Sequence, residues 1–520
     1  MARAEVDRHV VLRADAAPHI GMGHVMRCLA LADVLRDAGW RCGFIMRAFA
    51  GHAADLVEAR GHAAHLLPQP EVEPQDWLGV AQGVEITEAR DLLSDLSPEW
   101  VVLDHYGLGA DWVRGAVPAG CKTLVIDDLA NRAHAGALLV DQTLGRKPED
   151  YADLWPAGTP ILVGAPFALL HPNFARRAMS TPDRAGTHGV GAVLLALGGM
   201  DADDVTSAVI EALGPLASSV GLRRLDVALG ATAPHLDRVR ATLDQIIGAR
   251  SIPCTLHVGV PDMADLMAGA DLAIGAGGTM LWERCCLGLP TVAMCLADNQ
   301  RNGLSAARHA GAIDLLPRDW QTALPAALNR LAQPNARRDM SDSARQLVDG
   351  LGCKRIATTM SALDMRCRRA TPADAQAVFD WRSIGVDPGM NRQQSTPSLS
   401  DHIAWFEQAV QDRTRHMLII EDEAGPVGHV RLDVTSKATA RVSIALAPQR
   451  RGLALGAPTL CAGLMAGQRA GLRRFAAEIH DRNAGSIAVF MQLGFVRHGT
   501  DGAFGLYTAR VGQAALPQMI

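Results

Sequence analysis

The stretch RADAAPHIGMGH (residues 13–24) decides the fold of the N-terminal part of the chain. It follows an apolar run and leads into a long amphipathic segment, which predicts a strand, a glycine loop and a helix start. Gly21 and Gly23 let the backbone approach a ligand closely, and the first amides of a helix attract negative charge. We therefore expect an anionic ligand at this loop.

His24 stands where the predicted helix begins. A helix N-terminus disfavours the imidazolium and keeps the ring neutral, which is the form that a general base requires. The alternative is a histidine that caps the helix or packs against it. The spacing alone is compatible with both interpretations.

Length and composition exclude several classes of protein. A chain of 520 residues predicts about three domains. With 50 basic and 55 acidic residues the net charge is -5, so no nucleic-acid partner is expected. No apolar run approaches the roughly 20 residues that span a bilayer, so we expect a cytoplasmic protein without membrane insertion. Ten cysteines lie without metal-ligand spacing, and we expect neither a metal site nor a disulfide.

Short strand-like runs alternate with helical patterns twice along the chain, which predicts two Rossmann-type lobes, residues 1–160 and 161–360. Residues 160–189, rich in proline, glycine and polar side chains, read as the connection between them. In such sheets ligands bind at the carboxyl ends of strands, where Asp15 and Tyr106 stand. Each of these two residues could instead satisfy backbone groups.

Two glycine loops of the second lobe repeat the arrangement of strand, loop and helix. Gly199 and Asp201 follow one strand, and Gly278 and Glu283 follow another. Such loops can bind phosphate through backbone amides, and Glu283 can accept hydrogen bonds from a ribose. The alternatives are an ordinary turn at Gly199 and a dipole-complementing acid at Glu283. Asn299 follows the next strand and is a candidate for the same crevice.

The pattern changes near residue 365, where consecutive strands predict a separate α+β domain over residues 366–512. Its loop QRRGLA (residues 449–454) with Gly456 follows a strand and opens a helix. Consecutive amides in such a loop suit a pyrophosphate.

Six blocks of the first 350 residues resemble the nucleotide-sugar hydrolases of pseudaminic acid biosynthesis, which have a GT-B fold. The blocks are GMGHVMR (21–27), LDHY (103–106), IDDLANR (126–132), LGGMD (197–201), GAGGTMLWERCCLGLP (275–290) and DNQ (298–300). The resemblance implies hydrolysis of a UDP-linked diacetamido sugar to UDP and the free sugar. It also implies that His24 is the general base and that the second-lobe loops and Glu283 contact the nucleotide.

Residue types agree with inverting hydrolysis. A diphosphate leaves readily when amides stabilise it, so one base that activates water is sufficient. Substrate contacts are expected from Asp15, Gly23, Tyr106, Gly199, Asp201, Gly278, Glu283 and Asn299.

The C-terminal domain resembles the GNAT acetyltransferases, and in particular the N-acetyltransferases that modify a UDP-linked 4-amino sugar in the same pathway. This resemblance implies acetyl-CoA as the only cofactor. It assigns cofactor contacts to Gln449, Arg450, Arg451, Gly452, Ala454, Gly456, Asn483 and Ser486. Arg382 and His402 are expected to touch the acceptor; the alternative is that both are ordinary polar side chains on a helix surface. Phe490 stands where many GNAT enzymes have a catalytic tyrosine, so the acid and the base of this half are left unassigned.

Three functional hypotheses remain at this point. The first is a bifunctional enzyme that acetylates a UDP-linked 4-amino sugar and then hydrolyses the product. The second is a GT-B glycosyltransferase that uses a UDP-linked amino sugar, and the third is a nucleotide-sugar-binding protein with an inactive GNAT domain. Neither the stereochemistry of the sugar nor the oligomeric state follows from the sequence.

Overall fold

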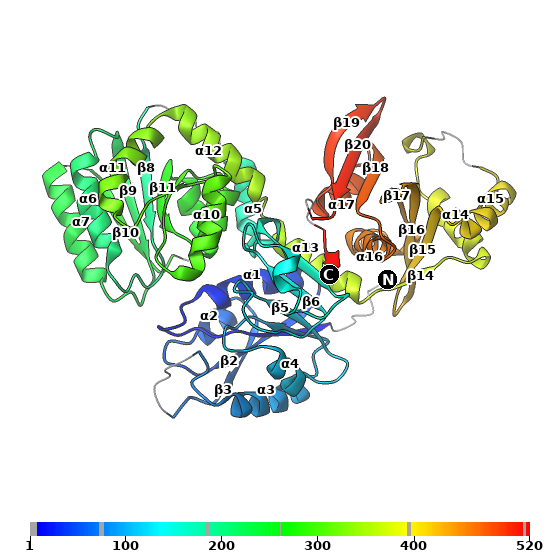
Figure 1. Cartoon of the computed structure of the whole chain (residues 1–520), viewed down its shortest axis with the longest axis horizontal. Helices are drawn as coiled ribbons and strands as arrows, with labels where there is room; N and C mark the ends of the chain where they lie inside the picture. The colour runs from blue at the N-terminus through cyan, green and yellow to red at the C-terminus, as the bar shows by residue number, and fades with distance from the viewer. Residues whose placement is uncertain are drawn as a thin grey trace. The chain divides into compact units, whose positions relative to one another are not determined.

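The computed structural model describes residues 8–71, 77–181, 188–250, 252–260, 262–392, 397–512 and 516–519. These residues form two compact units. The first unit comprises Met1–Gly136, Val140–Leu154 and Val163–Cys353, and the second comprises Ala137–Leu139, Trp155–Leu162 and Lys354–Ile520. Both are shown in Figure 1. The domain limits expected from the sequence stay predictions.

The first lobe is built on a parallel sheet in which β1 lies between β2 and β4, in the order β5-β4-β1-β2-β3. All five residues of β1 are buried, which is typical of a parallel strand covered on both faces. The elements are β1 (His9–Arg13), α1 (Gly23–Asp37), β2 (Arg41–Arg47), α2 (Ala54–Ala59), β3 (Ala63–Leu67), α3 (Gln82–Leu96), β4 (Trp100–Leu103), α4 (Ala110–Ala116), β5 (Lys122–Ile126), β6 (Leu138–Asp141), β7 (Pro160–Val163) and α5 (Pro172–Ser180).

The second lobe has a six-stranded parallel sheet in the order β10-β9-β8-β11-β12-β13. Two apolar clusters pack against its two faces. The elements are β8 (Gly191–Ala196), α6 (Val205–Leu216), β9 (Leu222–Leu229), α7 (Leu236–Arg250), β10 (Cys254–Val258), α8 (Met263–Ala268), β11 (Leu272–Ala276), α9 (Thr279–Cys286), β12 (Thr291–Met294), α10 (Arg301–His309), β13 (Asp314–Leu315), α11 (Trp320–Leu331), α12 (Pro334–Leu347) and α13 (Gly352–Leu363).

The strand order fixes where a ligand can bind. In the first lobe, successive strands are added toward one edge of the sheet from β1 to β3 and toward the other edge from β4 onward. In the second lobe, the same change of direction falls between β8 and β11. Loops that leave the carboxyl ends of two such strands diverge and open a crevice. The crevice of the first lobe is therefore flanked by the loops that precede α1 and follow β4.

The second unit is an α+β domain with a seven-stranded sheet in the order β14-β15-β16-β17-β18-β20-β19. Helix α16 packs on one face of β16, and α14 and α15 contribute to a separate core with β15. The elements are β14 (Arg366–Arg369), α14 (Ala375–Ser383), α15 (Leu399–Gln411), β15 (Arg415–Asp422), β16 (Gly425–Ser436), β17 (Thr439–Leu446), α16 (Gly456–Arg469), β18 (Arg474–His480), α17 (Ala484–Gln492), β19 (Val496–Asp501), β20 (Phe504–Arg510) and β21 (Gln518–Met519).

The expected fold class, two Rossmann-type lobes followed by an α+β domain, is confirmed, with local differences. Two short strands carry little strand signal in the sequence: β3, whose residues AAHLL are half exposed, and β14, whose residues RCRR are mostly charged. The connection over residues 160–189 contains α5, while its residues 182–187 lie outside the described chain. The last strand, β21, pairs antiparallel with β7.

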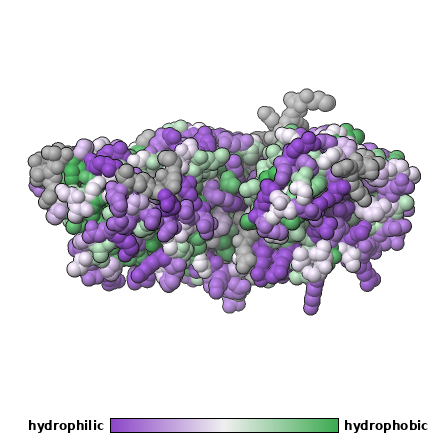
Figure 2. All heavy atoms as spheres, turned by 90° about the horizontal axis from the view of Figure 1, so that it is seen from above, coloured by the Kyte–Doolittle hydropathy of each residue, from purple (hydrophilic) through white to green (hydrophobic). Residues whose placement is uncertain are grey.

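Hydrophilic side chains predominate on the face seen in Figure 2, with hydrophobic ones scattered among them. Across the described residues, no helix combines the length and the apolar character needed to cross a membrane.

Candidate active site

A cavity of about 360 Å³ lies at the crevice of the first lobe. Its first-lobe lining includes Gly23, His24, Arg27, Trp77, Tyr106, Asp128, Gln142 and Thr143, and its second-lobe lining includes Gly278, Thr279, Trp282, Asn299 and Gln300. The cavity therefore brings together the expected residues Gly23, His24, Tyr106, Gly278 and Asn299.

His24 lies in the first turn of α1 and is 7% exposed. Its Nδ1 is 2.6 Å from Oδ1 of Asp104, which follows β4. A carboxylate can only accept a hydrogen bond, so Nδ1 carries the proton and donates a hydrogen bond to Asp104. In a neutral ring this leaves Nε2 with a free lone pair. The contact thus selects the tautomer that a base needs.

Arg27 holds Asp104 in place. It lies one turn after His24 on α1 and donates from Nε and Nη2 to the two oxygens of Asp104, both at 2.6 Å. Burial favours protonation of Asp104, but Arg27 and His24 outweigh it and keep the pKa of Asp104 well below its usual value. The carboxylate therefore stays ionised near neutral pH.

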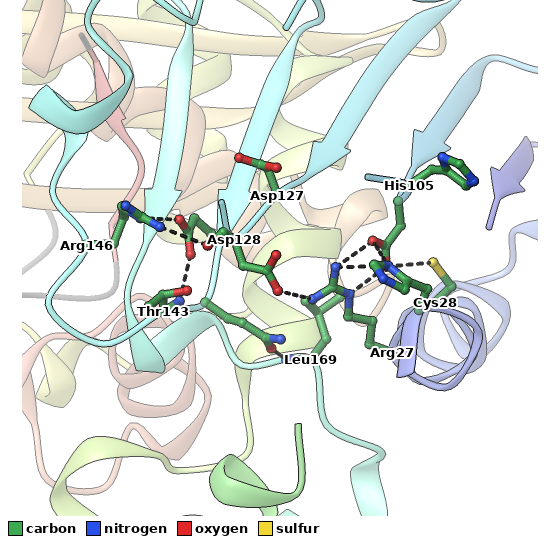
Figure 3. Close-up of polar contacts among 12 residues, drawn as sticks. Arg27, Cys28, His105, Asp127, Asp128, Thr143, Arg146 and Leu169 are labelled. Carbon is green, nitrogen blue, oxygen red and sulfur yellow. Dashed lines mark hydrogen bonds and ion pairs between the residues drawn. The ribbon is translucent and has the colours of Figure 1, made fainter. Parts of the chain in front are cut away.

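A second carboxylate belongs to the same network. Arg27 Nη1 donates to Asp128 Oδ2 at 3.0 Å, and Figure 3 shows the guanidinium extending toward Asp128. Tyr106 also forms a hydrogen bond with Asp128, and burial together with this carboxylate raises the pKa of the phenol. Tyr106 is thus a neutral donor.

Aromatic rings surround the imidazole. Tyr106 meets His24 edge-on with ring centroids 4.6 Å apart, and Trp77 lies 5.4 Å from His24 and 4.7 Å from Tyr106. Rings on two sides restrict how the imidazole can rotate and exclude bulk water from it.

Two helix N-termini at the cavity are not capped by side chains. Neither Met22 before α1 nor Gly278 before α9 has a capping hydrogen bond. Within the described chain, the backbone amides of residues 22–25 and 277–280 donate no hydrogen bond. Both termini therefore keep the unpaired donors that bind anions.

The helix after β8 differs. Asp201 accepts from the amides of Val205 at 3.1 Å and Thr206 at 2.8 Å, so it caps the start of α6. Neither Gly199 nor Asp201 is among the cavity residues. Their expected contacts with substrate stay predictions, and the α9 terminus is the better candidate for a diphosphate.

Asp15 is buried away from the cavity lining. Its Oδ1 accepts from Arg13 Nη1 at 2.6 Å and from the Arg47 amide at 2.7 Å, and Oδ2 lies 3.2 Å from His105 Nε2. The expected contact of Asp15 with substrate stays a prediction.

Glu283 lies in the second turn of α9, outside the cavity lining. Burial raises its pKa to about 7; Arg284 acts against this and Asp262 adds to it. Its buried Oε2 has no hydrogen-bond partner among the described residues. Such an oxygen is suited to accept from a ligand hydroxyl.

In the second unit, β17 and β18 pair in parallel over only three residues of each strand, Thr439–Arg441 and Arg474–Ala476. The loop beyond β17 has two left-handed residues, Gly452 (φ +74°) and Ala454 (φ +56°). Within the described chain the amides of residues 452–456 donate no hydrogen bond. This run of free amides at the start of α16 has the geometry of an anion nest.

The arginines of this loop are engaged by the protein. Arg450 pairs with Asp422, and Arg451 donates to the carbonyl oxygens of Leu446, Trp381 and Ile384. Gln449 is exposed. Gly452, Ala454 and Gly456 contribute free backbone amides to the nest. The side chains of Arg450 and Arg451 instead hold the loop against the rest of the domain.

The other expected residues of this unit are spread over three elements. Asn483 caps α17 by accepting from the Ser486 amide at 3.1 Å. Phe490 is buried against Phe495, with centroids 4.8 Å apart. Arg382 lies in the last turn of α14 and His402 lies on α15.

Sequence reasoning did not assign Arg27, Trp77, Asp104 or Asp128 to the site. Arg27 follows His24 by three residues on one helix, so helical spacing could have found it. Asp104 directly follows β4, and Asp128 lies in the loop after β5. Trp77 has no sequence signal. No group of three His, Cys, Asp or Glu side chains within the described chain has a geometry for a metal ion.

Comparisons with known proteins show what the two parts of the chain are similar to. Residues 364–496 match the family described as acetyltransferase (GNAT) domain. The chain is 24% identical to the spore coat polysaccharide biosynthesis protein SpsG of Bacillus subtilis, over 68% of this chain and 98% of that protein. It is 21% identical to the UDP-2,4-diacetamido-2,4,6-trideoxy-beta-L-altropyranose hydrolase of Campylobacter jejuni, over 56% of this chain and 93% of that protein.

Among solved structures, MurG of Acinetobacter baumannii is similar, with a TM-score of 0.46 and 17% identity, over 67% of this chain and 98% of that one. The match to the hydrolase extends over 294 residues, more than the C-terminal domain contains, so it involves the lobes. The resemblance inferred from the sequence blocks is confirmed. The chain therefore carries an acetyltransferase (GNAT) domain at residues 364–496, and two Rossmann-type lobes that are similar in sequence to a named hydrolase precede it.

Proposed function

We propose that the chain is a bifunctional enzyme of pseudaminic acid biosynthesis. Its C-terminal domain transfers acetyl from acetyl-CoA to the 4-amino group of UDP-4-amino-4,6-dideoxy-N-acetyl-β-L-altrosamine. Its two lobes then hydrolyse the UDP-linked diacetamido sugar to UDP and free 2,4-diacetamido-2,4,6-trideoxy-L-altrose. The observation that carries the proposal is the cavity where His24, paired with Asp104, adjoins two uncapped helix N-termini.

In the hydrolytic step, Nε2 of His24 accepts a proton from water while the water oxygen bonds to the anomeric carbon. The bond between that carbon and the diphosphate oxygen breaks, and UDP leaves with the electron pair. Free amides at the start of α9 stabilise the negative charge on the departing diphosphate. Attack from the face opposite the diphosphate inverts the anomeric configuration.

Other residues orient the sugar. Tyr106 and Asn299 line the cavity and provide a hydroxyl and an amide for sugar hydroxyl and acetamido groups. Asp104 stabilises the imidazolium that forms when His24 takes the proton, as the carboxylate of a serine-protease triad does.

For the acetyl transfer, the amides of residues 452–456 are proposed to bind the pyrophosphate of acetyl-CoA. The short pairing of β17 with β18 leaves strand edges unpaired beside this loop. A pantetheine chain, which carries amide groups, can hydrogen-bond to such an edge.

Product analysis tests the proposal. The purified chain is incubated with the UDP-linked 4-amino sugar, with and without acetyl-CoA, and the products are identified by mass spectrometry. We expect UDP and a free diacetamido sugar only when acetyl-CoA is present. Accumulation of the intact acetylated UDP-sugar would refute the hydrolase half, and UDP release that requires a glycan acceptor would favour a glycosyltransferase.

A further inference from the structure

An excess of positive charge lies on the face of the GNAT sheet opposite α16. Three guanidinium groups gather near one carboxylate: Arg431 Nε is 3.0 Å from Asp433 Oδ2, and Arg415 Nε is 3.6 Å from Asp433 Oδ1. Arg382 forms no hydrogen bond or ion pair within the described chain. We call Arg382, Arg415, Arg431 and Asp433 the arginine cluster.

Without a bound anion, the arginine cluster lowers the stability of the folded domain. Burial lowers the pKa of both Arg382 and Arg431. The positive charge of a neighbouring arginine lowers each pKa further. A guanidinium that is removed from water and placed beside another is destabilised unless an anion neutralises it. Arg415 is also paired with Asp412, at 3.4 Å, so two carboxylates face three guanidinium groups and one positive charge stays uncompensated.

Two histidines beside the cluster each have one ring nitrogen without a partner in the described chain, although the backbone of Ala375 forms a hydrogen bond with the His402 ring. His402 on α15 and His429 on β16 are 6% and 1% exposed, and the Nε2 of each is buried without a hydrogen-bond partner in the described chain. Burial and then Arg382 lower the pKa of both rings, that of His429 to about 3, so the rings are neutral. Neutral imidazoles can bind hydroxyl or phosphate oxygens without adding charge.

The position of the cluster relates it to acetyl transfer. Arg451 of the cofactor loop donates to the carbonyl oxygens of Trp381 and Ile384, which flank the Arg382 segment. Along β16, His429 and Arg431 alternate with Val430 and Leu432, whose side chains meet the α16 glycines Gly463 and Gly467. The cluster therefore lies across the sheet from the helix that the cofactor loop opens.

We propose that the arginine cluster, with His402 and His429, binds the diphosphate of a nucleotide-linked acceptor during acetyl transfer. This inference rests on the proposed acetylation of a UDP-linked amino sugar. Arg382 and Arg431 pair with the phosphate oxygens, and the two imidazoles bind the adjoining phosphate or sugar oxygens. The domain thereby selects amines that carry a nucleoside diphosphate.

Steady-state kinetics on the full chain test this inference. CoA release is measured with the UDP-linked 4-amino sugar and with the same amino sugar lacking UDP. We expect Arg382→Ala to raise KM for the UDP-linked acceptor about tenfold or more, the usual effect of losing a charge-assisted hydrogen bond. KM for acetyl-CoA and the rate with the free amino sugar should be unchanged, and Arg382→Lys should restore most of the binding.

Arg474→Ala is the matched control, because Arg474 is an exposed arginine of the same sheet. It should leave both KM values unchanged. An increased KM for acetyl-CoA in Arg382→Ala would overturn the inference, because the cluster would then bind the cofactor. Unchanged KM values for both substrates would also overturn it, because the cluster would then have only a structural role. A wild-type chain that acetylates no UDP-linked amino sugar would instead refute the proposed function and this inference with it.

Discussion

At the scale of single residues, the site depends on which ring nitrogen of His24 carries the proton. The 2.6 Å contact with Asp104 fixes the proton on Nδ1, and Arg27 fixes Asp104 with two further hydrogen bonds. Asp104 is fully buried and is not among the residues that line the cavity, so we expect it to act through the ring of His24. Asp104 is a positioning residue for His24.

Asp104→Asn is expected to lower kcat of UDP release by about 10²–10⁴-fold with little change in KM, as with the equivalent change in a serine-protease triad. The amide NH₂ group would donate to Nδ1 and move the ring proton to Nε2, which removes the basic lone pair. Initial rates of UDP release measure the effect. Asp111→Asn, an exposed acid of the same lobe, serves as control; equal kcat values for the two variants would contradict the role of Asp104.

Glu283 is expected to make UDP binding depend on pH. Its pKa of about 7 in the free protein means that the carboxylate forms as pH rises through neutrality, and the carboxylate is the better acceptor for ribose hydroxyls. The affinity for UDP should therefore increase between pH 6 and 8. Calorimetric titration of Glu283→Gln supplies the baseline, because a UDP phosphate also titrates near pH 6. Identical pH dependence in both proteins would exclude a contact with Glu283.

At the scale of elements, two helices of the second lobe show how a similar pattern leads to different local structures. Both α6 and α9 follow a strand and a glycine loop, but Asp201 caps α6 while α9 begins uncapped at the cavity. Only the uncapped terminus can offer its amides to a phosphate.

Gly278→Asp should weaken UDP binding by about tenfold or more, because a carboxylate at the start of α9 would occupy the amides and repel the diphosphate. Gly278 has φ +87° and no atom within 4 Å of an added Cβ, so Gly278→Ala reports backbone strain alone. Fluorescence or calorimetric binding compares the two variants. A loss of binding in Gly278→Ala as large as in Gly278→Asp would contradict the electrostatic explanation.

Two glycines on either side of α16 form a matched pair for testing the cofactor loop. Gly452 (φ +74°) precedes α16 and Gly471 (φ +92°) follows it, and an added Cβ meets no atom within 4 Å at either position. Alanine costs similar backbone strain at both, about 1–2 kcal/mol. We expect Gly452→Ala to raise KM for acetyl-CoA and Gly471→Ala to leave it unchanged. Similar KM values in the two variants would argue against cofactor binding by the 452–456 amides.

At the scale of the whole molecule, the two proposed activities belong to separate compact units. His24→Ala should abolish UDP release while CoA release in the presence of the UDP-linked 4-amino sugar continues at the wild-type rate. Arg382→Ala should impair acetylation but not hydrolysis of a substrate that is already acetylated. Loss of both activities in either variant would contradict independent sites.

The sequence predicts much of this architecture because strand and helix periods are local properties. The six strands of the second lobe and the helix that begins beside His24 follow from such patterns. Side-chain direction at a strand end does not follow. Asp15 and Asp104 both stand there, yet Asp15 enters a buried network with Arg13 while Asp104 reaches His24. The approach of Trp77 to His24 depends on tertiary folding and has no local pattern.

The central claim, that His24 directs water to the anomeric carbon, is tested most directly by hydrolysis of the acetylated UDP-sugar in ¹⁸O-labelled water. Mass spectrometry locates the label, and ¹H NMR identifies the first anomer formed. We predict one ¹⁸O atom in the free sugar, none in UDP, an inverted first product, and no reaction with His24→Ala. Label in UDP, a product of retained configuration, or unchanged turnover by His24→Ala would contradict the claim.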